Sequence, residues 1–252
     1  MPLLGKALHR IYGDTVFAEM EICRSCTFVQ TKIPFPDESL AGLYADYRAD
    51  SYNRERIRLE PSYAAIARDV GLCRQEIDAR TIGLSQWLTT RIAPEPGFSM
   101  LDYGGADGKF LPDLPGVKYV FEISNIPPVP GIIRIPKESD LTAYSYVQLA
   151  HVLEHVTNPL LLTKKAASIV KPGGHLYIEV PIEISDHDLN RLLAGDRTVS
   201  LFIHEHINRY SVRSMTELLR AANLPIKALE TSEVDFGWAH ATVIRALVQP
   251  PA

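Results

Sequence analysis

From about residue 97 onward, short apolar runs rich in β-forming residues alternate with amphipathic or polar stretches. Runs that are apolar at consecutive positions are typical of parallel strands covered on both faces, and their alternation with longer stretches is typical of βαβ units. We therefore expect a doubly wound α/β domain over residues 97–252, with a helix from Ser214 to Ala222. The expected strands are 98–103, 118–122, 131–135, 145–150, 175–180, 228–231 and 241–244.

Two smaller segments precede this domain. Alternating residues at 15–20 and 27–31 predict a β-hairpin within an N-terminal module of residues 1–36. Apolar residues at helical spacing predict a helical cap over residues 37–96, in which Pro61 is suited to the first position of a second helix.

Composition excludes several classes of protein. The chain has 252 residues, of which 46% are hydrophobic, so it can bury a core and is not disordered. A net charge of -4 and a pI near 6.1 argue against nucleic acid as a partner. No apolar run is long enough to cross a bilayer and no signal-peptide core is present, so we expect a cytoplasmic protein. Three cysteines cannot form a disulfide framework.

The most informative local feature is the stretch LDYGGADGKF at residues 101–110, read as a strand that ends in a turn of small residues before a helix. Small residues are needed there if a ligand lies directly against the backbone. Glu122, about twenty residues further on, can accept hydrogen bonds from both hydroxyls of a ribose. Two nucleotide cofactors compete for this site. A dinucleotide fingerprint has the spacing GxGxxG, whereas Gly104, Ala106 and Gly108 follow a DxGxGxG register.

With two further motifs, this register resembles the class I S-adenosylmethionine (SAM)-dependent methyltransferases over about residues 98–248. Residues 146–159, YVQLAHVLEHVTNP, are similar to the family's fourth strand and the vLEHv-x-xP segment after it. Residues 170–176, VKPGGHL, are similar to the turn that leads into its fifth strand. The resemblance implies a Rossmann-like fold with a mostly parallel seven-stranded sheet, here preceded by the small β-hairpin and the helical cap.

The resemblance also implies where SAM binds. The glycine turn would contact the amino acid and ribose parts, Glu122 would hold the ribose hydroxyls, and the end of the fourth strand would line the site. Ala106 adds a methyl group where the family usually has none. A short loop at 124–130 with three prolines replaces the usual helix, so the adenine pocket is expected to differ in shape. The expected cofactor-binding residues are Asp102, Gly104, Gly105, Ala106, Asp107, Gly108, Glu122, Ile123, Ala150, His151 and Tyr52.

Histidines supply the candidate catalytic groups. The segment HEHIN at residues 204–208 resembles an element found after the fifth strand in a branch that includes sugar C- and O-methylating enzymes. A histidine oriented by a carboxylate can take the proton that a hydroxyl or an acidic C–H loses during methyl transfer. We therefore expect His206 to be the general base, with Glu205 orienting it or binding a substrate hydroxyl, and His155 as a further catalytic candidate. The alternative is that His206 only packs or caps the helix that follows.

Metal binding is a less favoured alternative at two places. His151 and His155 are four residues apart, on one face if the segment is helical, but no third ligand is evident. Cys23 and Cys26 resemble half of a zinc ribbon, but a second CxxC is absent. We therefore expect no metal at either place, and a hairpin that packs without one.

A stretch rich in Tyr and Arg, residues 44–63, has three interpretations. It could stack single-stranded nucleic acid, which the acidic pI disfavours, or form a solvated helix face with internal ion pairs. We favour a lid over the cofactor cleft, with Tyr52 as its contact.

The sequence thus predicts a methyltransferase that modifies an oxygen or carbon of a small polar acceptor. The resemblance around residues 204–208 favours a sugar, either a nucleotide sugar or a glycan end, and implies a place in polysaccharide biosynthesis. Two alternatives stay open: another metabolite as acceptor, or a SAM-binding protein without turnover that docks a partner. The oligomeric state is not predicted.

Overall fold

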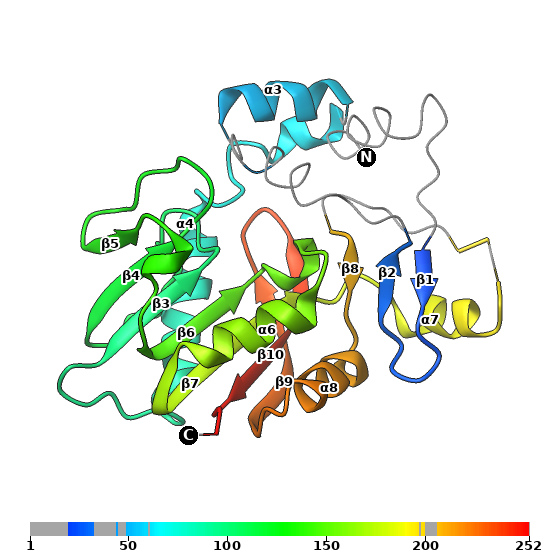
Figure 1. Cartoon of the computed structure of the whole chain (residues 1–252). Helices are drawn as coiled ribbons and strands as arrows, with labels where there is room; N and C mark the ends of the chain where they lie inside the picture. The colour runs from blue at the N-terminus through cyan, green and yellow to red at the C-terminus, as the bar shows by residue number, and fades with distance from the viewer. Residues whose placement is uncertain are drawn as a thin grey trace.

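A sheet of seven strands organises the chain in the computed structural model, which describes residues 20–32, 44, 49–59, 61–196, 198–199 and 206–251 (Figure 1). The strand order is β5-β4-β3-β6-β7-β10-β9; β10 runs antiparallel to both neighbours and the other adjacent pairs are parallel. The predicted mostly parallel seven-stranded sheet is confirmed. Its strands are β3 (Ser99–Tyr103), β4 (Val117–Phe121), β5 (Ile132–Ile135), β6 (Tyr144–Ala150), β7 (Val170–Pro181), β9 (Ile226–Asp235) and β10 (His240–Val248).

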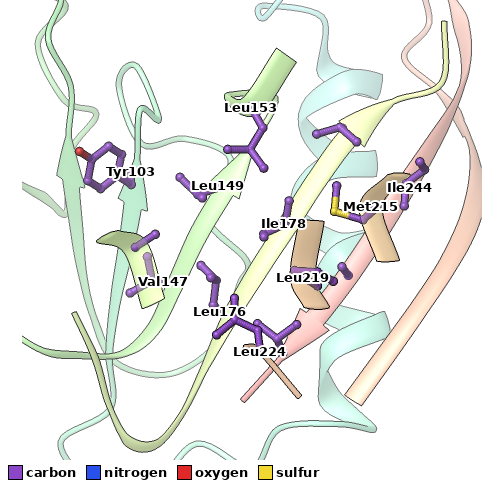
Figure 2. Close-up of a cluster of buried hydrophobic side chains, with 14 of the residues drawn as sticks. Tyr103, Val147, Leu149, Leu153, Leu176, Ile178, Met215, Leu219, Leu224 and Ile244 are labelled. Carbon is purple, nitrogen blue, oxygen red and sulfur yellow. The ribbon is translucent and has the colours of Figure 1, made fainter. Parts of the chain in front are cut away.

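Two helices, α6 (Pro159–Ser168) and α8 (Val212–Ala221), cover one face of this sheet. Side chains at alternate strand positions point to this face, as the two-residue period of a strand requires, and pack against Met215 and Leu219 of α8 (Figure 2). Both helices have strong start signals. Asn158 accepts the backbone N–H of Leu161, and Ser211 opens a capping box for α8.

The opposite face is covered by the chain just before β3. Leu84, Leu88 and Ile92 lie in and after α5 (Leu84–Thr89) and pack against Met100 of β3 and Tyr146 of β6. A segment that the sequence assigns to the helical cap therefore contributes to the core of the sheet domain. It also contains α4 (Arg74–Asp78) and the π-helical turn η2 (Ala79–Gly83).

The connection from β3 to β4 differs from the expectation of a helix after the glycine turn. Turns and bends occupy residues 104–116, with no helix among them. Pro112 and Pro115 explain the difference, because each removes a backbone donor that a helix would use. The link from β4 to β5 is a loop, as its prolines predict. The short 3-10 helices η3 (Glu138–Asp140) and η4 (Leu153–His155) flank β6.

The hairpin forms part of a second, three-stranded sheet in the order β1-β2-β8. Within the described residues β1 is Met20–Ile22 and β2 is Val29–Thr31, and most of the strand expected at 15–20 lies outside the described part. Strand β8 (Asn208–Arg209) lies almost 180 residues after β2 in the sequence and pairs antiparallel with it. Helix α7 (Asp186–Leu193) packs against this small sheet through Leu189, which contacts Val29.

The described part of the cap contains α3 (Asp50–Leu59), which lies beyond the carboxyl ends of the main strands in Figure 1. The expected helix from Pro61 is only a 3-10 helix, η1 (Pro61–Ala65), followed by hydrogen-bonded turns to residue 72. Gly71, at φ 75°, adopts a left-handed conformation that interrupts a helix. Across the described ranges, no helix is long and apolar enough to span a membrane.

Candidate active site

A cavity of about 930 Å³ opens at the carboxyl ends of the parallel strands. Its walls come from both sides of the point between β3 and β6 where the strand order reverses, which is where open α/β sheets bind ligands. Most of the predicted site residues line it: Asp102, Gly104, Gly105, Ala106, Glu122, Ile123, Ala150, His151, His155 and His206. Asp107, Gly108 and Tyr52 do not line it, and Glu205 lies outside the described residues.

The glycine turn brings bare backbone to the cavity wall. Gly104 and Gly108 have φ values of 76° and 78°, and Ala106 between them has 52°. A non-glycine residue in this region is strained by roughly 1–2 kcal/mol, so Ala106 carries a cost that glycine would not. At Gly105 a Cβ atom would lie 2.1 Å from Cγ of Asp102, so no side chain fits there. The turn is shaped to bring a ligand against its main chain.

Asp102 lies beneath this turn with its side chain wholly buried. Among the described residues, its Oδ1 atom has no hydrogen-bond partner. Burial raises the pKa of Asp102 to about 7, although the nearby Arg80 acts in the opposite direction. A buried carboxylate with one unpaired oxygen at a cavity wall suits a cationic group of a ligand, such as the ammonium of an amino acid.

Glu122 follows β4 and is fixed by backbone donors. The N–H of Ala106 lies 2.9 Å from Oε2, and that of Ser124 lies 2.8 Å from Oε1. Each carboxylate oxygen can accept a second hydrogen bond, so this side chain is held in place with acceptor capacity remaining. Ile123, which is 60% exposed, extends the wall beside it. The arrangement can bind a ribose diol, as the spacing of Asp102 and Glu122 predicts.

Glu154 and His151 form a buried ion pair after β6. Nδ1 of His151 lies 3.3 Å from Oε1 of Glu154, and its Nε2 lies 3.2 Å from Oε1 of Glu179. Burial and Arg80 act to lower the pKa of His151, but the two carboxylates outweigh them and raise it to about 9. For Glu154, burial acts to raise the pKa, and the surrounding imidazoles lower it to about 2. A raised pKa favours the protonated imidazole, which suits His151 as a partner for the two carboxylates.

His155 and His206 meet at the cavity wall, with ring centroids 4.6 Å apart. They come from different parts of the chain, η4 and the segment just before β8. Nδ1 of His206 lies 2.7 Å from Oε1 of Glu183, and Nδ1 of His155 lies 2.8 Å from the hydroxyl of Tyr44. Burial acts to lower the pKa of His206, and Glu183 outweighs it, so the pKa is raised. These contacts orient both rings.

Residues 151–155 are not one helical face, because only the single 3-10 turn η4 forms there. His151 and His155 nevertheless both approach Glu154, since Nε2 of His155 lies 4.0 Å from its Oε1. His151 itself has φ 56°, a left-handed conformation that turns the chain at the end of β6.

Sequence reasoning missed several residues of the cavity. Glu183 comes just after the carboxyl end of β7, and an acidic residue at such a strand end was the signal that could have found it. From the Tyr- and Arg-rich stretch, Tyr63 lines the cavity, with Arg56 stacked 3.8 Å from its ring centroid. Tyr52 is instead buried behind Arg56, whose Nη1 donates to its hydroxyl at 3.3 Å.

The hairpin between β9 and β10 supplies an aromatic wall. Phe236 and Trp238 stack with centroids 5.6 Å apart, and both line the cavity. Nε1 of Trp238 donates to Oε2 of Glu76 at 2.7 Å, which fixes the indole. The cavity therefore combines a backbone cradle with carboxylates, an imidazole pair and flat apolar rings, a combination suited to an adenosyl cofactor and a polar second ligand.

Comparison with known proteins agrees with this geometry. A family model described as a methyltransferase domain matches residues 75–229. No curated protein sequence matches the chain.

Two solved structures show the same fold. One is the 1,6-didemethyltoxoflavin-N1-methyltransferase of Burkholderia thailandensis with bound 1,6-didemethyltoxoflavin and S-adenosylhomocysteine; it is 15% identical with a TM-score of 0.56, over 93% of this chain and 100% of that one. The other is the magnesium protoporphyrin IX methyltransferase of Synechocystis PCC 6803 with bound SAM; it is 14% identical with a TM-score of 0.50, over 82% of this chain and 96% of that one.

Proposed function

This chain belongs to the methyltransferase-domain family and is accordingly a SAM-dependent methyltransferase, for which we propose a small polar acceptor that is methylated on oxygen or carbon. The observation that supports this proposal is a juxtaposition within one cavity. The bare backbone at Gly104 and Gly105, above the unpaired Oδ1 of Asp102, shares that cavity with the imidazoles of His155 and His206.

The cradle fits SAM. The unpaired Oδ1 of Asp102 would receive the ammonium of the methionine part, and Glu122 would accept the ribose hydroxyls. The lack of room for a Cβ at Gly105 keeps the side chain of Asp102 packed directly beneath the turn. When bound, SAM supplies an electrophilic methyl group on a sulfonium.

We propose His206 as the general base, which takes the proton of the group that becomes methylated. Its ring lines the cavity, and the 2.7 Å contact with Glu183 fixes its orientation. A carboxylate that accepts from one ring nitrogen directs the other nitrogen and sets the tautomer, as in other His–carboxylate pairs. Glu183 can thus orient the ring of His206, and the orienting role of Glu205, which lies outside the described residues, stays a prediction. His155 stands beside His206 and would bind an acceptor hydroxyl.

Among small polar acceptors, a sugar fits these surroundings. The acceptor end carries two imidazoles, the carboxylate of Glu183 and the hydroxyl of Tyr44, all able to bind hydroxyl groups. The flat face of Trp238 and its neighbour Phe236 supplies the apolar surface on which sugar rings commonly stack.

Two measurements test the proposal. SAM or S-adenosylhomocysteine should raise the melting temperature, since a ligand that binds only the native state stabilises it. SAM with a labelled methyl group should then be incubated with panels of nucleotide sugars, glycans and unrelated polar metabolites. Label in a sugar supports the full proposal, and label only in another metabolite removes the sugar. SAM binding without any transfer points to a binding protein, and no SAM binding overturns the proposal.

A further inference from the structure

We infer that Glu154, His155 and His206 form a binding site for a divalent transition-metal ion in the wall of the cavity. Each of the three offers one ligand atom, and these atoms lie within 4.8 Å of one another. Two imidazole nitrogens with one carboxylate oxygen are a donor set that suits Zn²⁺ and Co²⁺, whereas Mg²⁺ and Ca²⁺ prefer oxygen ligands alone.

The buried carboxylate of Glu154 is the strongest part of this inference. Its side chain is wholly buried, and neither oxygen makes a hydrogen bond to any part of the chain that the structure describes. A buried carboxylate without hydrogen bonds is costly unless a cation satisfies it. His151 supplies one positive charge at 3.3 Å, through an ion pair that does not have hydrogen-bond geometry. A metal ion would give the carboxylate the direct ligand bond that it lacks.

Both histidines are oriented as metal ligands usually are. In each ring Nδ1 contacts an outer partner: the hydroxyl of Tyr44 for His155, and the carboxylate of Glu183 for His206. Metal-bound histidines almost always bind an outer carboxylate, carbonyl or similar group through the second nitrogen, which fixes the ring and its tautomer. The metal would therefore be bound through Nε2 of each ring.

The spacing needs little adjustment. Bonds of 2.0–2.1 Å in a tetrahedral site place ligand atoms roughly 3.4 Å apart. Nε2 of His155 is 4.0 Å from Oε1 of Glu154, and no pair in the group exceeds 4.8 Å. Small rotations of side chains, without a change in the backbone, are enough to close the site.

The remaining coordination positions face the cavity, because His155 and His206 line it and Glu154 lies behind them. This part of the inference rests on the proposed function: the ligand from the cavity would be a hydroxyl oxygen of the methyl acceptor. A metal ion lowers the pKa of a hydroxyl that it binds. With the ion bound, Nε2 of His206 would be a metal ligand and could not accept a proton. The hydroxyl would instead release its proton to solvent water before methyl transfer.

The test measures metal binding directly. The whole chain is used with Cys23→Ser and Cys26→Ser, because this thiol pair could itself bind zinc, and metal is first removed with a chelator. Titration with ZnCl₂ in a calorimeter should show one equivalent bound, and CoCl₂ should give the visible absorption of Co²⁺ with nitrogen and oxygen ligands. Failure to bind either ion overturns the inference.

Variants locate the ion. His155→Ala changes a partly exposed residue at the cavity wall, so the protein should fold, and Zn²⁺ affinity should fall by at least about tenfold. Glu154→Gln should act in the same direction, with circular dichroism to establish that it folds. His187→Ala is the matched control, since that imidazole is exposed on α7 and should leave affinity unchanged. Equal affinity in wild type and His155→Ala would place the ion elsewhere and overturn the site.

SAM binding is measured on the same metal-free protein. If Zn²⁺ binds but SAM does not, the result counts against the proposed function and leaves the metal site supported. Normal SAM binding without Zn²⁺ binding would remove the metal site alone. A chelator that abolishes methyl transfer, with recovery on addition of Zn²⁺ or Co²⁺, would establish the role of the ion toward the acceptor.

Discussion

A Cβ atom on Gly105 would lie 2.1 Å from Cγ of Asp102, so the buried carboxylate occupies the space that any other residue at position 105 would need. The backbone of Asp102 lies near the carboxyl end of β3, between β4 and β6, and cannot move away without disturbing the sheet. The backbone of the glycine turn and the carboxylate of Asp102 therefore pack so closely that neither can change without displacing the other.

Gly105→Ala should lower SAM affinity by at least about tenfold and also destabilise the fold, because overpacking commonly costs about 1–3 kcal/mol. Calorimetric titration with SAM and thermal unfolding measure the two effects. Gly83→Ala is the control, since nothing lies within 4 Å of its Cβ position and its φ is helical; stability should be unchanged or raised by up to about 1 kcal/mol. Normal SAM binding by Gly105→Ala would show that the cofactor does not approach this turn.

Asp102 should make SAM binding and stability depend on pH in opposite directions. Burial raises its pKa to about 7 from 3.8, so the folded apo-protein holds the proton more tightly than the unfolded chain. The contribution of Asp102 to the free energy of unfolding should therefore be largest at low pH. It should fall as the pH rises from about 4 through 7. SAM affinity should rise over the same range, because the ionised carboxylate attracts the ammonium.

Asp102→Asn cannot titrate and should show neither trend at this site. Chemical denaturation and SAM titration at a series of pH values, for wild type and variant, measure both. Parallel pH profiles in the two proteins would remove Asp102 as the titrating group.

His206→Ala should reduce turnover by roughly a hundredfold or more and leave SAM affinity nearly unchanged, because the imidazole faces the acceptor end. Glu183→Gln keeps the shape of the side chain and weakens only its hold on the ring, so a smaller loss, about tenfold, is expected. Steady-state kinetics with calorimetric SAM binding separate these effects. An equal loss of SAM binding in His206→Ala would make the residue structural.

The small sheet should position His206. Val29 is fully buried in a cluster with Ile184 and Leu189, and its strand pairs with β8, which begins two residues after His206. Val29→Ala should cost about 1–3 kcal/mol of stability and lower turnover while SAM affinity is retained. Glu21→Ala, on the exposed side of β1, should stay within about 0.5 kcal/mol of wild type in the same assays. Unchanged turnover in Val29→Ala would mean that the sheet does not position the site.

Much of the fold could be predicted because apolar runs and turn residues determine it locally. The strands and the order of motifs follow from hydrophobic pattern, and the expected α8 starts where Ser211 caps it. The helix after the glycine turn was wrong, since Pro112 and Pro115 outweigh the fold-family expectation. The helix from Pro61 was also wrong, because only the 3-10 helix η1 and hydrogen-bonded turns form before Gly71.

The cofactor end was easier to predict than the acceptor end for a physical reason. Asp102, the glycines and Glu122 lie on two adjacent parallel strands and the short loop between them, where spacing along the chain fixes spacing in the fold. The acceptor end instead gathers Tyr44, His155, Glu183 and His206 from four separate segments. No local pattern links such residues, so the partners of the two histidines appear only once the chain is folded.

The pairing of β2 with β8 also has a consequence for how the molecule is made. Thr27 in the hairpin contacts Ser211, 184 residues later, so the hairpin leaves the ribosome long before its partner exists. Until then one edge of β2 presents unpaired backbone groups, a surface on which nascent chains can associate wrongly. Pairing with β8 covers that edge and also positions the imidazole of His206. Formation of the acceptor end therefore coincides with the end of the period in which the edge can associate wrongly.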